Sequence, residues 1–138
     1  GKSYECAKDA FDLKIKNVVD GLASTEFYCP GSTIKAEFDN AHPLAYGMPA
    51  EGLVLFHSSP VFEVTPGRFN ENYSAIVRYK NQNLLKSGWL IGEKNLAKKP
   101  AMLSATYGDG EVVLIGFRAQ HRNQMDGTFK FLFNTIIR

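Results

Sequence analysis

Hydrophobic and polar residues alternate in two segments of the chain and form unbroken apolar runs in several others. Residues 13–19 and 33–38 alternate, which is typical of strands with one exposed face, and the lysines of 13–19 favour a sheet edge. Apolar runs at residues 52–56, 61–64 and 74–80 predict three further strands. The pattern therefore predicts a protein in which strands outnumber helices.

The last part of the chain carries the clearest pattern. Residues 101–107 and 111–117 flank a turn with two glycines around Asp109, which predicts a hairpin. The run at 112–117 does not alternate, so we expect a strand covered on both faces. From Asp126, a suitable N-cap, apolar residues recur at helical spacing. We expect this apolar face to pack on the sheet; it consists of Phe129, Leu132, Phe133, Ile136 and Ile137.

Helices are expected to be short elsewhere. Residues 3–11 and 93–98 predict helices, 44–46 a helical turn, and Gly88 and Gly92 interrupt the apolar residues of 81–92. The whole pattern predicts one domain, residues 1–138, of the α/β or α+β class. We expect a mixed β-sheet with a C-terminal hairpin and a C-terminal amphipathic helix packed on it.

Length and composition exclude several classes. A chain of 138 residues with 44% hydrophobic and 22% charged residues can bury a core and is not of disordered composition. No apolar run approaches the roughly 18 residues of a membrane span, so we expect no membrane partner. Nucleic acid is not expected either, because Lys94, Lys98 and Lys99 have no aromatic neighbours. The compartment cannot be read from composition.

Charge is distributed unevenly. Residues 1–76 hold 6 basic and 10 acidic side chains, a net charge of −4, while residues 77–138 hold 10 basic and 4 acidic, a net charge of +6. The basic half could attract an anionic ligand or an acidic partner. The alternative is a solvated face whose charge the other half balances.

The principal candidate site is the polar loop after the last predicted strand. Guanidinium, amide and imidazole donors suit a carboxylate or phosphate, since Arg presents a planar fork to such oxygens. The alternative is that these side chains cap the sheet and bond loop carbonyls. The candidate ligand-binding residues are Arg118, Gln120, His121, Arg122 and Gln124.

Three further residues are secondary candidates. His42 and Tyr46 lie four apart in a turn, where we expect His42 to brace the loop. His57 lies beside two serines, but neighbouring strand residues face opposite sides, and no Gly-x-Ser-x-Gly elbow is present. Ser59 could still share a side with His57. We predict no catalytic residue.

Cysteine and aromatic residues leave alternatives open. Cys6 and Cys29 can pair only if the fold brings them together, and free thiols are equally compatible with the sequence. Their spacing predicts neither a metal site nor a cofactor. Trp89 could form a stacking surface with Phe56, Phe62 and Tyr79, although such residues more often build a core.

Six segments, in this order, resemble a known family. They are 27–32, 42–49, 58–62, 108–117, 118–124 and 127–134. The chain resembles the latter part of the class I glutamine amidotransferase-like domain that is carried C-terminal to some secreted bacterial zinc carboxypeptidases. This resemblance implies an accessory part of an exported bacterial protein and assigns no catalytic role. The His-x-x-Glu zinc pair of the peptidase and the half of the fold that would hold a nucleophile elbow are absent from the sequence.

Together these features favour a non-catalytic accessory or assembly module that binds a small anion at the 118–124 loop. We expect a homo-oligomer or a larger parent protein as partner, because a sheet edge left open must be paired. The alternative is a fragment of a zinc carboxypeptidase or amidotransferase-like hydrolase whose catalytic residues lie outside this chain.

Overall fold

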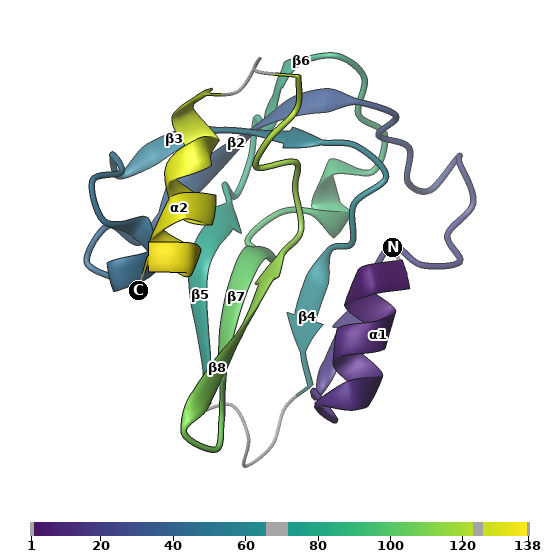
Figure 1. Cartoon of the computed structure of the whole chain (residues 1–138). Coiled ribbons are helices and arrows are strands. Elements are labelled where there is room, and N and C mark those ends of the chain that lie inside the picture. The colour runs from purple at the N-terminus through teal and green to yellow at the C-terminus, as the bar shows by residue number, and fades with distance from the viewer. Residues whose placement is uncertain (1, 66–71, 123–125, 138) are drawn as a thin grey trace.

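The computed structural model describes residues 2–65, 72–122 and 126–137, which form a curved antiparallel half-barrel with a short helix near each end (Figure 1). The helices are α1 (Lys2–Ala10) and α2 (Phe129–Ile137), with 3-10 turns η1 (Pro43–Ala45), η3 (Glu93–Asn95) and η4 (Asp126–Thr128). The strands are β1 (Ile15–Asn17), β2 (Ser32–Phe38), β3 (Glu51–Phe56), β4 (Phe62–Val64), β5 (Tyr73–Tyr79), β6 (Leu85–Ser87), β7 (Pro100–Tyr107) and β8 (Gly110–Ile115).

Every strand pairing in the described residues is antiparallel. The main sheet has the order β3-β2-β5-β7-β8 with β6 added beside β2, and β1 pairs with β4 separately. The expected mixed sheet and the α/β alternative are therefore wrong, and the fold is α+β-like and mainly β. Parallel neighbours need a long crossover, usually a helix, and both α-helices lie near the ends of the described chain.

The expected hairpin is confirmed, but the expected burial of its second strand is wrong. β7 pairs with β8 from Met102↔Ile115 to Tyr107↔Gly110 across a turn in which Gly108 has φ +58°. In the described residues β8 pairs only with β7, so it is an edge strand. Its residues Val112 and Val113 are half-buried rather than enclosed. The unbroken apolar run marks a strand here, but it does not report two covered faces.

Two hydrophobic clusters hold the fold together. The larger lies between the sheet and its covering segments and includes Ile34, Phe56 and Tyr79. The smaller lies beneath α1, where Tyr4 packs against Phe62 and donates a hydrogen bond from its hydroxyl to the Ile15 carbonyl at 3.2 Å. The buried face of α1 thus holds the short β1-β4 sheet beside β7.

Helix α2 packs on the sheet in an orientation opposite to the one expected. Phe131 is fully buried, with ring centroids 5.0 Å from Phe38 and 5.9 Å from Phe117. Asn134 also faces inward, because its amide donates hydrogen bonds of 3.0 Å to the carbonyls of Leu44 and Tyr46. The helix therefore presents one aromatic ring and one amide to the rest of the protein.

The apolar face that helical spacing predicts to be core is instead exposed. Leu132, Phe133, Ile136 and Ile137 are 38%, 53%, 71% and 80% exposed. The polar residues of α2, Lys130, Asn134 and Thr135, lie on the same side of the helix as Phe131, so periodicity marks the apolar side but does not decide which side meets the sheet. The expectation that Asp126 is the N-cap also fails, since Asp126 begins η4 and α2 starts at Phe129.

An acidic side chain links the two sheets. Glu63 on β4 forms ion pairs with Lys16 on β1, at 2.6 Å, and with Lys99, which directly precedes β7. Hydrogen bonds from Lys16 and Lys99 lower the pKa of Glu63 below its usual range. The ionised carboxylate consequently stabilises the fold.

We expect Phe131→Ala to lower the free energy of unfolding by about 3–5 kcal/mol, because it empties a buried site between two aromatic rings. Phe133→Ala, two positions along the same helix, should change it by only about 0.5 kcal/mol or less in the monomer. Chemical denaturation of both variants, at a concentration at which light scattering shows each protein to be monomeric, measures the difference. A larger loss for Phe133→Ala would mean that α2 packs with the other face.

Glu63→Gln is expected to reduce stability at neutral pH and to lose that effect in acid. Because the folded state lowers the pKa of Glu63, its stabilisation is present above the unfolded value of about 4.3 and disappears as pH falls through the folded pKa. Denaturation of both proteins from pH 7 downwards tests this. Glu37→Gln, whose carboxylate makes no ion pair in the described residues, is the control. A gap between Glu63→Gln and the parent that is independent of pH would contradict the prediction.

Candidate functional site

The backbone after β8 fixes how the predicted donor loop is presented. The Arg118 amide donates to the Leu55 carbonyl at 2.9 Å and forms an isolated antiparallel bridge with β3. Phe117 and Ala119 on either side are buried, and Thr128 donates a hydrogen bond of 2.8 Å to the Ala119 carbonyl. Arg118 is therefore held on a fixed backbone with its side chain exposed.

The other predicted donors follow directly. Gln120 and Arg122 are exposed, His121 is half-buried, and Arg122 has a left-handed backbone with φ +47°. Gln124 lies outside the described residues. The side chains of Arg118, Gln120, His121 and Arg122 make no hydrogen bond or ion pair within the described part of the chain, so the alternative role of bonding loop carbonyls is not observed there.

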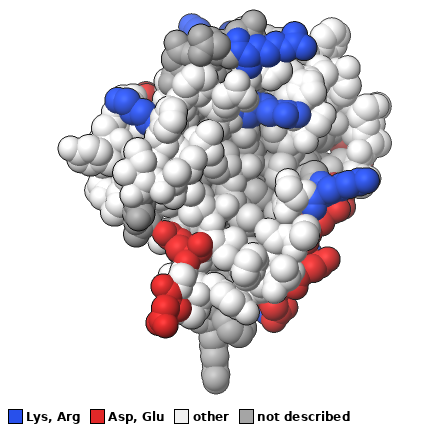
Figure 2. Space-filling view, viewed as in Figure 1, with Lys and Arg blue, Asp and Glu red and all other residues white. Residues whose placement is uncertain are grey.

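Charges are separated on the face shown in Figure 2. Lysine and arginine side chains gather mainly towards the end where β6 and the start of α2 lie. Aspartate and glutamate side chains gather mainly towards the opposite end, near the β7-β8 hairpin and α1. Basic and acidic side chains on this face therefore lie mainly towards different ends of the molecule. The separation does not follow the two sequence halves, because the hairpin with Asp109 and Glu111 belongs to residues 77–138.

His57 lies near the same strand end as Arg118 but makes no catalytic pair with a serine. It is exposed, follows β3, and its ring lies against Gly31, where a Cβ would be 3.3 Å from Cδ2. The Ser59 hydroxyl donates to the His57 carbonyl at 3.2 Å and lies 3.3 Å from the His57 amide, so it closes a backbone turn. This geometry leaves the imidazole without the hydroxyl that a nucleophile pair requires.

His42 braces its loop, as expected. Its Nδ1 accepts a hydrogen bond from the Leu44 amide at 3.2 Å and caps η1. Tyr46, 78% exposed, lies at the other end of this turn. Both line a pocket of about 410 Å³ together with Asn134 and Ile137 of α2. The secondary candidates thus belong with the end of α2.

An apolar surface lies over α2. We call it the α2 face and define it by Tyr46, Leu132, Phe133, Ile136 and Ile137. These account for five of the eleven large hydrophobic side chains that are exposed in the described residues. Residues at such spacing lie side by side on a helix, and Tyr46 joins them through the pocket it shares with Ile137. A concentrated apolar surface of this kind is typical of an interaction site.

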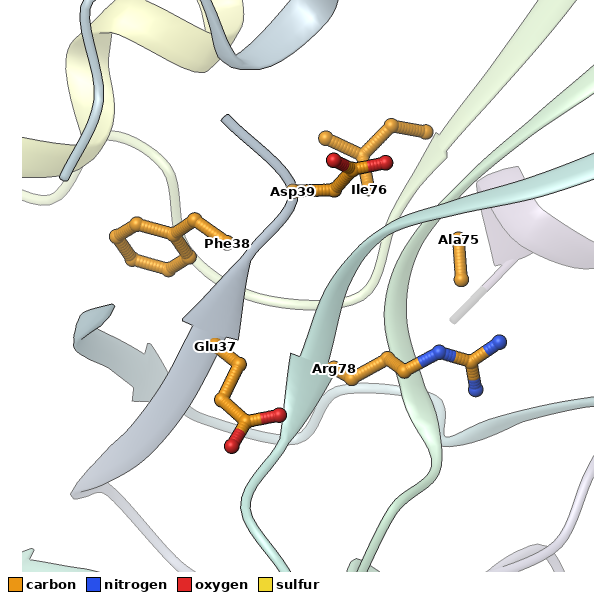
Figure 3. Close-up of a pocket in the computed structure, with 6 residues that line it drawn as sticks. All are labelled: Glu37, Phe38, Asp39, Ala75, Ile76 and Arg78. Carbon is orange, nitrogen blue, oxygen red and sulfur yellow. The ribbon is translucent and has the colours of Figure 1, made fainter. Parts of the chain in front are cut away.

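A second hollow, of about 320 Å³, lies where β2 and β5 separate (Figure 3). It is lined by Glu37 near the end of β2, by Asp39 just after that strand and by Arg78 of β5. Glu37 and Arg78 are cross-strand partners, yet the guanidinium points away and donates to the Lys98 carbonyl at 3.3 Å. The three charged groups point apart in Figure 3, so the hollow shows no convergent set of catalytic groups.

The two cysteines are free, with Cys6 exposed and Cys29 buried. Burial raises the pKa of the Cys29 thiol, and a hydrogen bond with Ser32 opposes this only in part. Burial also raises the pKa of Tyr79 far above its ordinary value. Cys29 is therefore a poor nucleophile at neutral pH. No group of three or more His, Cys, Asp or Glu side chains in the described residues could hold a metal ion.

Trp89 departs from the expected aromatic cluster. Phe56, Phe62 and Tyr79 are core residues, whereas Trp89 is 63% exposed and faces Tyr28. The glycines at 88 and 92 are the sequence signal that could have indicated a tight loop presenting this indole. None of the described helices is long and apolar enough to cross a membrane.

Comparisons with known proteins give one structural match. No protein-family model matches the chain, and no curated protein matches it in sequence. The fold is similar to that of a ThuA-like protein from Bacteroides uniformis, with a TM-score of 0.45 and 20% sequence identity. The match covers 80% of this chain and 45% of that one, so the chain spans less than half of the ThuA-like protein.

Proposed function

We propose that this chain is a non-catalytic assembly module that self-associates through the α2 face. The observation that carries the proposal is the orientation of α2, which turns Asn134 and the buried Phe131 inward but leaves Phe133, Ile136 and Ile137 in solvent. Exposed apolar area costs free energy that a partner of similar character recovers by covering it. A second copy supplies such a surface by symmetry.

The surroundings of the α2 face favour this role. Lys130 is the sole charged residue of α2, and its ammonium donates to the Gly47 carbonyl at 2.9 Å. An interface built here would therefore bury little charge at its centre, as stable protein interfaces require. The Nδ2 group of Asn134 already donates to two carbonyls and would need no new acceptor.

The non-catalytic part of the proposal rests on the separation of reactive groups. The Ser59 hydroxyl bonds the His57 backbone, Cys29 is buried, and the charged groups of the β2-β5 hollow point apart. Catalysis by a nucleophile needs a base within hydrogen-bond reach. None of these three places supplies a nucleophile together with a base within hydrogen-bond reach of it.

The module also carries, in our proposal, a small anion at the loop of residues 118–122. Arg118 and Arg122 are exposed, and neither side chain makes an ion pair within the described residues. A carboxylate or phosphate would therefore not have to displace a competing acid. The loop lies before α2, whereas the pocket with Tyr46 and Ile137 lies by its last residues.

The alternative function is part of a larger hydrolase, of the carboxypeptidase-associated or amidotransferase-like kind, whose catalytic residues lie outside this chain. The same exposed α2 face favours it, because another part of a parent protein could cover these side chains. The two functions differ in what the isolated chain does in solution.

We expect the isolated chain to be an oligomer at micromolar concentration and Ile136→Glu to weaken self-association roughly thirtyfold or more, about 2 kcal/mol, by placing a charge in an apolar interface. Light scattering on a sizing column measures the mass. Leu85→Glu, a comparable change of an exposed apolar residue on β6, is the matched control and should leave the mass unchanged. If the unmutated chain is monomeric at every concentration measured, the result favours the alternative function.

Inorganic phosphate is expected to raise the melting temperature of the chain relative to chloride at equal ionic strength, since a ligand that binds only the folded state stabilises it. Arg118→Ala with Arg122→Ala should remove this rise. Lys86→Ala with Lys94→Ala removes the same charge from exposed positions elsewhere and should retain it. Equal responses in both double variants would show a non-specific charge effect and contradict the anion site.

A further inference from the structure

Two exposed aromatic rings lie together on the surface next to β6. Trp89 is 63% exposed and Tyr28 is 43% exposed, with ring centroids 6.5 Å apart and planes at 83°. Large aromatic side chains usually bury most of their surface, so an exposed indole beside an exposed phenol is an informative exception. This pair lies outside the α2 face and outside the 118–122 loop.

The backbone of Trp89 is held by a buried hydroxyl. Ser32, 2% exposed, donates from its hydroxyl to the Trp89 carbonyl at 2.7 Å and accepts from the Trp89 amide at 2.9 Å. Gly88 precedes it with φ +99°, and a Cβ there would lie 2.5 Å from the Ser32 hydroxyl oxygen. The loop can therefore approach Ser32 only because residue 88 is glycine.

The backbone of Tyr28 is fixed in the same way. Tyr28 and Ile91 exchange two backbone hydrogen bonds, of 3.1 and 2.9 Å. Gly92 follows with φ +79°, where a Cβ would lie 2.0 Å from the Glu26 carbonyl. Both rings thus stand on backbone tied by contacts distant in sequence. Because the backbone that carries both rings is already fixed, little conformational entropy is lost when a ligand binds.

Charge around the two rings decides between kinds of ligand. Residues 23–32 contain one charged side chain, Glu26, and residues 85–95 contain three, Lys86, Glu93 and Lys94, so the two segments hold two acidic and two basic side chains and no net charge. A nucleic acid backbone requires several cations, and a quaternary ammonium ligand is usually enclosed by several aromatic faces. A proline-rich peptide lies along a groove lined by aromatic side chains, whereas these two rings are nearly perpendicular, so each can stack on a separate ring of a ligand but together they form no single flat floor. What remains is an uncharged ligand with an apolar face and a polar rim.

We propose that Tyr28 and Trp89 form a platform for the sugar rings of a neutral oligosaccharide. The C–H face of a pyranose stacks on an indole, while its hydroxyls point outwards to polar groups. Polar side chains that can form hydrogen bonds with these hydroxyls lie on or beside the same segments: Glu26, Ser87 and Asn95. The Asn95 amide already links the two segments by donating a hydrogen bond to the Glu26 carbonyl at 3.2 Å. The platform is independent of the proposed assembly role.

The test uses the chain's single tryptophan, which is Trp89 itself, as the reporter. The full chain is titrated with cellohexaose, chitohexaose, maltohexaose and mannohexaose up to millimolar concentration. Stacking removes water from the indole, so we expect its emission to move to shorter wavelength with at least one of these sugars. No change with any of the four would overturn the proposal.

Variants separate stacking from other effects and are measured by calorimetry with the sugar that binds. Trp89→Ala should weaken binding roughly tenfold or more, and Tyr28→Ala less, as loss of an aromatic contact requires. Tyr107→Ala removes an aromatic side chain of comparable exposure on the hairpin and should bind like the parent. Circular dichroism confirms that each variant is folded. Parent-like binding by a folded Trp89→Ala would refute the platform.

Two further probes distinguish a sugar from the ligands excluded above. Polyproline peptide and single-stranded oligothymidine are titrated under the same conditions. A larger emission shift with either of them than with the sugars would replace the proposal with a peptide or nucleic acid site. Ile136→Glu should bind the sugar as the parent does, so failure of the assembly role and failure of the platform give different results.

Discussion

Burial of Phe131 between Phe38 and Phe117 is the contact on which the surface of this protein depends. The side chains of a helix have fixed positions around its axis. The ring that packs into the core therefore decides which side chains remain exposed. With Phe131 inside, Asn134 meets the carbonyls of η1, and Phe133, Ile136 and Ile137 face solvent. The exposed apolar surface is thus a direct consequence of core packing.

The antiparallel topology decides where the donor loop and the loop of Trp89 lie. β3 and β8 are both edge strands of the curved main sheet, and the backbone after β8 reaches β3, where Arg118 pairs with Leu55. That pairing covers part of one edge and holds the donor loop at the same time. The loop that carries Trp89 is fixed separately, by Ser32 at the start of β2. The same sheet therefore supports three surfaces: the α2 face, the loop of residues 118–122 and the loop that carries Trp89.

Sequence reasoning succeeded where an element has a local cause. Turn residues around Asp109 and the apolar runs gave the hairpin and most strands, and the backbone role of His42 followed from its place in a proline turn. It failed where partners are distant in the chain. The burial of β8 depends on its place in the sheet, and the exposure of Trp89 depends on a hydroxyl 57 residues away. Neither dependence leaves a periodic signal.

The amino-acid sequence by itself determined most of the strands, the C-terminal hairpin and their order, because propensity, turn chemistry and hydrophobic period act over a few residues. Tertiary structure alone decided that the sheet is antiparallel throughout the described residues, that Phe131 rather than Phe133 is buried, and that Trp89 is presented to solvent. The physical reason is that the spacing of apolar residues marks one side of α2 but carries no information about what that side will meet. The surface formed by Phe38 and Phe117 takes Phe131, which lies on the same side of the helix as Asn134, and this contact leaves the apolar side in solvent.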